Sequence, residues 1–104
     1  MMTPRYRIMY SPRAIKDIQQ IYSHIAEDSP ERAENVADTI LLAISQLKFF
    51  PKRQQVFLAG HAMSQTVYSL PVEPYMVYFR ILEVESLIRI ARIRHGARRP
   101  LKRF

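Results

Sequence analysis

The chain has 104 residues, no cysteine and a formal net charge of +7. This length supports one domain that buries its own core, so a single domain over 1–104 is expected. The absence of cysteine excludes disulfides, thiolate catalysis and cysteine-based metal sites. The first residues lack the long apolar run of a signal peptide or membrane span, so a cytoplasmic protein without membrane contact is predicted.

The positive charge is concentrated at the C-terminal end. From position 92 onward there is no acidic residue, and the basic residues are Arg92, Arg94, Arg98, Arg99, Lys102 and Arg103. Such a concentration favours an anionic partner, either a nucleic acid or an acidic protein segment. We therefore predict a folded core over 1–94 and a basic C-terminal tail over 95–104.

The first half of the chain predicts a strand followed by two helices. Arg5–Tyr10 is expected to be a strand, and Ser11-Pro12 then supplies an N-cap and a first-turn proline for a helix that ends near Asp28. Its apolar residues recur at helical spacing and form one stripe: Ile15, Ile18, Ile21, Tyr22 and Ile25. The polar residues are expected to lie mostly away from this stripe: Arg13, Lys16, Asp17 and Gln20.

Ser29-Pro30-Glu31 repeats this start signal for a second helix, which is predicted to run to Phe50 before Pro51. Its apolar side contains Ala33, Val36, Ala37, Ile40, Leu41, Ile44 and Leu47. Two helices joined by so short a connection form an antiparallel hairpin. Each apolar stripe is too wide for the other helix to bury, so the hairpin needs a sheet to pack on.

The second half predicts β structure. Within a loop over Pro51–Gln65, Val56–Leu58 is expected to be a short strand or an anchor. Thr66–Leu70, Tyr75–Leu82 and Leu87–Arg94 are rich in aromatic and β-branched residues, which predicts three strands in an antiparallel meander. The fold class is therefore α+β, with the helix hairpin on one face of the sheet.

The last predicted strand carries a group of arginines. Alternation predicts that Arg92 and Arg94 share one face and that Arg89 points to the other. Ile88 and Ile90 then share the face of Arg92 and Arg94, which is unusual for a half-buried strand. This conflict indicates a bulge or twist near Ala91, or a strand that a partner covers on both faces.

Several segments together resemble the ParE branch of the RelE/ParE toxin superfamily. They are the opening Tyr6–Ala14, Phe50-Pro51 at the end of the second helix, Pro74–Ile81, and the closing Ile90–Arg99 with its His95-Gly96 pair. The resemblance implies the toxin of a type II toxin–antitoxin module, neutralised by a ParD-like antitoxin. ParE-like members are associated with inhibition of DNA gyrase, whereas RelE-like members cut messenger RNA on the ribosome.

The residues favour the first activity. RNA cleavage needs a general acid, a general base and cations around the phosphate. Aligned on Phe79-Arg80, the chain has Met76 where RelE-like nucleases carry an arginine, and Arg80 lies roughly 13 Å further along the strand. A non-catalytic inhibitor of DNA gyrase or of a related topoisomerase is therefore predicted, and the topoisomerase target comes from the family resemblance.

The alternative is a RelE-like, ribosome-dependent endoribonuclease that uses His95, Arg80, Arg92 and Arg94. His95 sits where a general acid or base would serve near neutral pH, although it also fits a plain turn with Gly96. A third hypothesis is a nucleic-acid-binding module without toxicity. It rests on charge alone, and direct nucleic-acid binding is not favoured.

Two surfaces follow from this interpretation. The effector surface is predicted to contain Arg92, Arg94, His95, Arg98 and Arg99. The antitoxin surface is predicted to contain Tyr22, Tyr68, Tyr78 and Arg80, with a place in the core as the alternative for the tyrosines. No pattern for a metal site is present, and no cofactor is expected.

Overall fold

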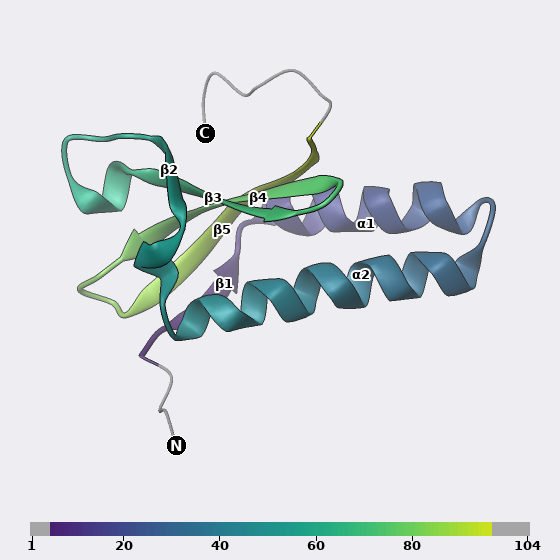
Figure 1. The fold of residues 1–104 in the computed structure, drawn as a ribbon, viewed down its shortest axis with the longest axis horizontal. Helices are drawn as coiled ribbons and strands as arrows, with labels where there is room; N and C mark the ends of the chain where they lie inside the picture. Colours follow the sequence, from purple (N-terminus) through teal and green to yellow (C-terminus); the bar gives the residue numbers. More distant parts are fainter. Residues whose placement is uncertain (1–4, 97–104) are drawn as a thin grey trace.

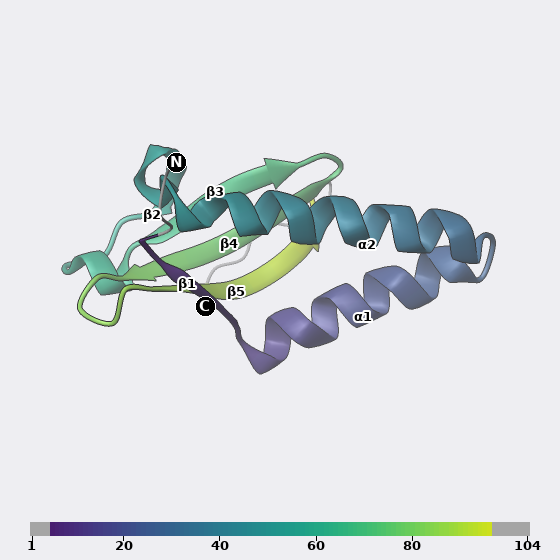
Figure 2. The same cartoon turned by 90° about the horizontal axis from the view of Figure 1, so that it is seen from below.

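The computed structural model describes residues 5–96 and has an α+β fold (Figure 1). Its elements are β1 (Arg7–Tyr10), α1 (Pro12–Ala26), α2 (Pro30–Ser45), β2 (Gln55–Leu58), β3 (Val67–Val72), β4 (Tyr75–Leu82) and β5 (Leu87–His95). The strand order in the sheet is β1-β5-β4-β3-β2. The β1–β5 pair is parallel and the other pairs are antiparallel. Both helices lie on one face of the sheet (Figure 2).

Both helices begin at the predicted serine caps. The Ser11 hydroxyl accepts a hydrogen bond from the Ala14 N–H at 3.0 Å, and the Ser29 hydroxyl accepts one from the Arg32 N–H at 3.2 Å. Each serine precedes a proline at the first helical position, where no N–H is needed. The two Ser-Pro signals therefore mark the helix starts correctly.

The end of the second helix differs from the prediction. The helix α2 stops at Ser45 and passes into a 3₁₀ turn at Gln46–Lys48 instead of continuing to Phe50. Phe50 precedes a proline, which disfavours helical backbone, and its φ of −140° and ψ of 62° are not helical. The Lys48 carbonyl instead accepts hydrogen bonds from the N–H groups of Arg5 and Tyr6, which fasten the start of the chain to this turn.

The core lies between the helix hairpin and the sheet, as the wide apolar stripes predicted. Its largest fully buried side chains come from α2, from the turn that follows it, and from β4 and β5: Ile40, Ile44, Leu47, Phe79, Ile81, Ile88, Ile90 and Ile93. Burying such a side chain contributes roughly 1.5–3 kcal/mol relative to leaving it exposed. This packing fixes which face of each strand points toward the helices.

The predicted irregularity near Ala91 is a bulge. Tyr78 pairs with Arg92 while the next residue, Phe79, pairs with Ile90, so Ala91 has no pairing residue on β4. The extra residue restores burial on the helix side, because Ile90 and Ile93 are both almost completely buried. The bulge thus resolves the conflict in the alternation of β5.

The prediction that Arg89 faces away from Arg92 and Arg94 is wrong, and the bulge is the reason. In the register, Arg89 lies opposite Arg80, and Arg94 lies opposite Met76. Residues directly opposite each other share a face. Arg89 is therefore on the same side of the sheet as the other two arginines, which we term the outer face because it is turned away from the helices.

The segment Val56–Leu58 forms a strand, as one of the two interpretations predicted, and pairs with β3. The strand β3 continues through Pro71 to Val72, beyond the predicted end at Leu70. The neighbouring β2 pairs no further than Ser69, so Pro71 lies where β3 is an edge strand and a missing N–H is tolerated.

Candidate functional site

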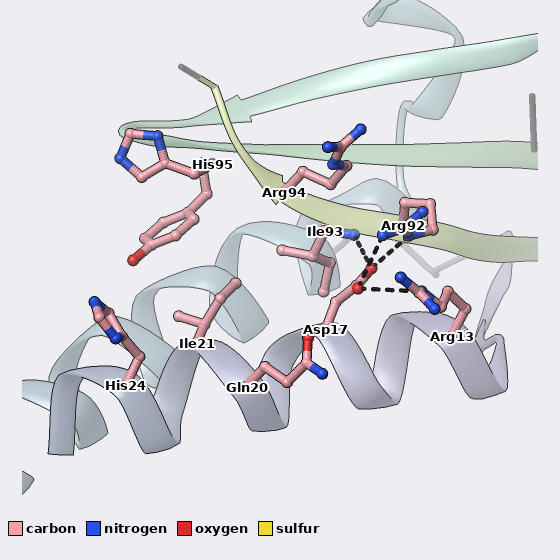
Figure 3. Close-up of a pocket in the computed structure, with 10 residues that line it drawn as sticks. Arg13, Asp17, Gln20, Ile21, His24, Arg92, Ile93, Arg94 and His95 are labelled. Carbon is pink, nitrogen blue, oxygen red and sulfur yellow. Dashed lines mark hydrogen bonds and ion pairs between the residues drawn. The ribbon is translucent and has the colours of Figure 1, made fainter. Parts of the chain in front are cut away.

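Asp17 on α1 is the centre of the polar contacts beside β5 (Figure 3). Only 5 % of the residue is exposed. Its carboxylate accepts hydrogen bonds from the Ile93 N–H at 2.9 Å and from the Arg92 guanidinium at 2.8 and 3.2 Å. The Arg13 Nε lies 3.6 Å away. One carboxylate therefore joins the helix to the backbone of β5 and holds two arginine side chains.

This contact closes an edge of the sheet. The strand β1 pairs with β5 only as far as Ile90, so within residues 5–96 the edge of β5 that faces away from β4 has no neighbouring strand beyond that point. Ser11 covers the next positions, since its N–H donates to the Ile90 carbonyl and its hydroxyl donates to the Ala91 carbonyl, both at 2.9 Å. Asp17 then accepts the Ile93 N–H. Unpaired backbone groups at a sheet edge are thereby satisfied.

The sequence interpretation did not find Asp17, which it placed among residues mostly away from the apolar stripe. The signal was present, because position 17 lies three residues after the buried Ala14 and four before Ile21 on the inner side of α1. An acidic residue on the buried side of a helix needs a paired cation or hydrogen-bond donors. Arg92 and the Ile93 N–H supply them.

A cavity of about 540 Å³ opens between α1 and the end of β5. Its lining combines basic, amide, aromatic and apolar side chains with one carboxylate: Arg13, Asp17, Gln20, Ile21, His24, Tyr75, Arg92, Ile93, Arg94 and His95. Three of the predicted effector residues, Arg92, Arg94 and His95, meet here. The other two, Arg98 and Arg99, lie outside the described residues.

His95 belongs to the helix side of the sheet. It lies opposite Tyr75 in the register, with the two rings edge to face and their centroids 5.6 Å apart. Tyr75 packs against the core and alternates in phase with the buried Val77. The strand β5 includes His95, so regular structure extends one residue into the predicted tail.

Of the predicted phosphate-binding arginines, Arg80 is the one that does not line the cavity containing His95, whereas Arg92 and Arg94 do. Arg80 and Arg94 are on the outer face, and Figure 3 shows Arg94 leaving β5 in a different direction from His95. Arg92 is held at the sheet edge by Asp17. Among the described residues, the structure thus separates His95 from Arg80 by the thickness of the sheet.

The predicted antitoxin residues do not form one surface. Tyr68 and Tyr78 are each 8 % exposed. Tyr68 stacks on Phe79 with ring centroids 5.5 Å apart, and Tyr78 packs against Phe57 at 4.7 Å. These two tyrosines contribute to the interior, which was the alternative interpretation.

Tyr22 and Arg80 are the accessible members of that predicted set. Tyr22 is 37 % exposed on α1, while Arg80 lies on the outer face of the sheet. The two side chains therefore belong to different layers of the fold.

Residues 5–96 contain neither a group of metal-binding side chains nor a membrane-spanning helix. In that range, no three histidine, aspartate or glutamate side chains gather in a way that would hold a metal ion. Neither described helix is long and apolar enough to cross a membrane.

The fold and sequence match known toxins. The family model described as the ParE toxin of the type II toxin–antitoxin system parDE matches residues 8–100. The chain belongs to the ParE toxin family. A curated relative, Toxin RelE2 of Caulobacter vibrioides, is 29% identical over 93 residues, which cover 88% of this chain and 97% of the relative. The protein is therefore the toxin of a type II toxin–antitoxin system in the ParE/RelE superfamily.

Solved structures from both branches share the ParE-family fold. A chain from the chromosomal ParDE system of P. aeruginosa superposes with a TM-score of 0.69 at 21% identity, covering 88% of this chain and 96% of that one. A chain from the RelBE2 toxin–antitoxin complex of Mycobacterium tuberculosis superposes with a TM-score of 0.62 at 20% identity, covering 89% of this chain and 99% of that one. A chain from the archaeal RelE–RelB complex of Pyrococcus horikoshii OT3 superposes with a TM-score of 0.64 at 14% identity, covering 91% of this chain and 99% of that one.

Proposed function

We propose that this ParE-family toxin inhibits DNA gyrase through protein–protein contact, without catalytic turnover, and acts in the cytoplasm. The choice of gyrase rests on membership of the ParE family, whose characterised members are associated with that target. The observation that carries the non-catalytic part is the separation of His95 from Arg80 by the sheet.

A ribonuclease needs its acid or base and its phosphate-binding cations around one reacting group, within hydrogen-bond reach. His95 lies on the helix side beside Tyr75, whereas Arg80 lies on the outer face. Arg92 is occupied by the buried carboxylate of Asp17. Opposite Arg94, at the position where RelE-like nucleases carry an arginine, stands Met76, which offers no charge. These placements support a binding role for the basic surface.

The partner that neutralises the toxin is proposed to be a ParD-like antitoxin. Support comes from the similar solved structures, two of which are toxin–antitoxin complexes while the third comes from a ParDE system. Tyr22 and Arg80 remain the proposed contact residues, because Tyr68 and Tyr78 are buried. The proposed effector surface keeps Arg92, Arg94 and His95 together with Arg98 and Arg99.

A RelE-like ribonuclease is the second candidate, and the specific observation in its favour is the similarity to Toxin RelE2. The two functions separate in a translating extract supplied with the toxin without antitoxin. We expect intact messages together with inhibited supercoiling by purified gyrase. Ribosome-dependent cleavage of messages that disappears in His95→Ala would overturn the proposal and establish the ribonuclease.

The role of the basic tail is tested by deleting residues 98–104. If the tail contacts the target, toxicity falls more than the folding stability does, because the deletion removes four positive charges that an acidic partner surface would bind: Arg98, Arg99, Lys102 and Arg103. Growth inhibition in cells and thermal unfolding of the purified variant measure the two effects. Unchanged toxicity at normal expression would remove Arg98 and Arg99 from the effector surface.

A further inference from the structure

A second basic concavity lies at the start of α1, beside the bulge in β5. It encloses about 580 Å³ and is lined by Ser11, Pro12, Arg13, Arg80, Arg89, Ala91 and Arg92. We term its four basic residues, Arg13, Arg80, Arg89 and Arg92, the arginine cluster. Arg13 and Arg92 also line the cavity of Figure 3, whereas Arg80 and Arg89 line only this one.

The charges in the arginine cluster are poorly balanced. Asp17 pairs with Arg13 and Arg92. Within residues 5–96, neither Arg80 nor Arg89 has an acidic side chain within 4.0 Å. The Nη1 of Arg89 lies 4.0 Å from the Met9 sulfur. Four guanidinium groups thus share a single carboxylate, which leaves a strong positive potential.

Arg80 and Arg89 also lie directly opposite each other on neighbouring antiparallel strands. Like charges in that position destabilise a sheet. An arrangement that costs stability in the free protein is expected where a ligand compensates for it, because proteins break such local rules mainly at functional sites. An anionic ligand between the two guanidinium groups would remove the repulsion.

The bulge at Ala91 assembles this cluster. Without the extra residue, Arg89 and Arg92 would point to opposite faces of β5, since their separation is odd. With it, both lie on the outer face with Arg80. Bulges often re-aim side chains next to functional sites. Here the bulge is fixed by Ser11, whose hydroxyl donates to the Ala91 carbonyl.

We propose that the arginine cluster binds a carboxylate-bearing peptide segment of a protein partner, with Arg80 and Arg89 as the anchoring pair. Guanidinium groups bind carboxylates through two parallel hydrogen bonds. Met9, which is 45 % exposed and contacts Arg89, places an apolar surface beside the charges. A peptide that carries acidic and apolar side chains uses both, whereas a nucleic-acid backbone uses the charges alone.

The proposed antitoxin is the natural source of such a segment, and in this respect alone the inference rests on the proposed function. Binding of a peptide to the toxin requires neither gyrase nor toxicity. A toxin that fails to inhibit gyrase yet binds the peptide would refute gyrase as the target, while the proposed peptide binding by the arginine cluster would stand. A toxin that inhibits gyrase but does not bind the peptide would support gyrase as the target and refute peptide binding by the arginine cluster.

The test uses a short fluorescent peptide of alternating glutamate and leucine and the full-length toxin. The variant is the double substitution Arg80→Gln with Arg89→Gln. The control is Lys16→Gln with Arg32→Gln, which removes the same charge from exposed helix positions. We expect the cluster variant to weaken binding about tenfold or more, because charge-assisted hydrogen bonds are lost. The control variant should change it little.

Two competitors and a stability measurement complete the test. The glutamine version of the peptide should not compete, and single-stranded RNA should compete only weakly at physiological salt. The thermal midpoint of the free cluster variant should equal or exceed that of the wild type, because repulsion is relieved. Equal weakening in both double variants, tight RNA binding that the cluster variant loses, or a cluster variant that fails to fold would each overturn the proposal.

Discussion

At the residue scale, Asp17 shows how one buried charge organises a sheet edge. Its carboxylate replaces the missing neighbour strand by accepting the Ile93 N–H, and it fixes the Arg92 side chain, of which 18% is exposed. A buried carboxylate without partners is strongly unfavourable, so the three contacts have to form together. Asp17 is therefore a structural residue that determines where Arg92 can reach.

Asp17→Ala is expected to lower the free energy of unfolding by about 3 kcal/mol, because Arg92 and the Ile93 N–H both lose their acceptor. Asp17→Asn should cost less, since an amide oxygen still accepts one of these bonds. Arg13→Ala is the matched control: its side chain is 59% exposed and its loss should cost under about 1 kcal/mol. Equal effects of Asp17→Ala and Arg13→Ala in urea unfolding would contradict this account.

A second residue, Glu83, predicts how stability depends on pH. Its two carboxylate oxygens accept hydrogen bonds from the Tyr6 hydroxyl at 2.9 and 3.0 Å, and Lys52 and Arg5 form ion pairs with it. The Tyr6 hydrogen bond, followed by contacts with these two cations, lowers the pKa of Glu83. Ionised Glu83 thus favours the folded state above the usual carboxyl range, and this contribution disappears as the pH falls through the lowered pKa.

Glu83→Gln should therefore reduce stability at neutral pH and flatten the loss of stability below about pH 4. Tyr6→Phe removes the main hydrogen bond and should produce part of the same flattening. Urea unfolding at a series of pH values measures both effects. If the free energy of unfolding of Glu83→Gln falls as steeply with decreasing pH as that of the wild type, other carboxylates cause the acid sensitivity.

At the element scale, the two helix caps look alike in sequence and differ in the structure. Ser11 and Ser29 both precede a proline and both cap a helix. Ser11 is buried and also bonds the carbonyl of the bulge residue Ala91, whereas the Ser29 hydroxyl makes an exposed cap bond. The Ser11 hydroxyl thus joins the start of α1 to β5, while the cap bond of Ser29 stays within the first turn of α2.

Ser11→Ala is expected to lower the free energy of unfolding by about 2 kcal/mol, because it removes the helix cap and also the hydroxyl that donates to the partly buried Ala91 carbonyl. Ser29→Ala should cost about 0.5–1 kcal/mol as an exposed cap. The difference appears in the midpoint of chemical unfolding of the two variants. Equal losses would show that the Ser11 to Ala91 bond contributes nothing.

At the scale of the whole molecule, local signals predicted the elements well. The Ser-Pro caps fixed both helix starts, and the apolar spacing of α1 and α2 identified the hairpin that needs a sheet. These predictions succeeded because each depends on residues close in sequence. The family followed from the same segments, since most of Tyr6–Ala14 and all of Ile90–Arg99 lie inside the matched region, residues 8–100.

The pairing of strands that are far apart in the sequence could not be predicted from local patterns. The parallel pairing of β1 with β5 joins residues about eighty positions apart, and no local pattern encodes it. The conflict near Ala91 indicated a bulge, but only the partner strand shows that it moves Arg89 to the outer face. For the same reason the separation of His95 from Arg80 was invisible in the sequence.

The most direct test of the central claim is a titration of the toxin against supercoiling by purified gyrase, without antitoxin or ribosomes. A non-catalytic inhibitor that binds through the effector surface should give inhibition that saturates as its concentration passes that of gyrase. His95→Gln should inhibit with the same saturating form, because no proton transfer is involved. Full supercoiling at a large excess of folded toxin would contradict the account.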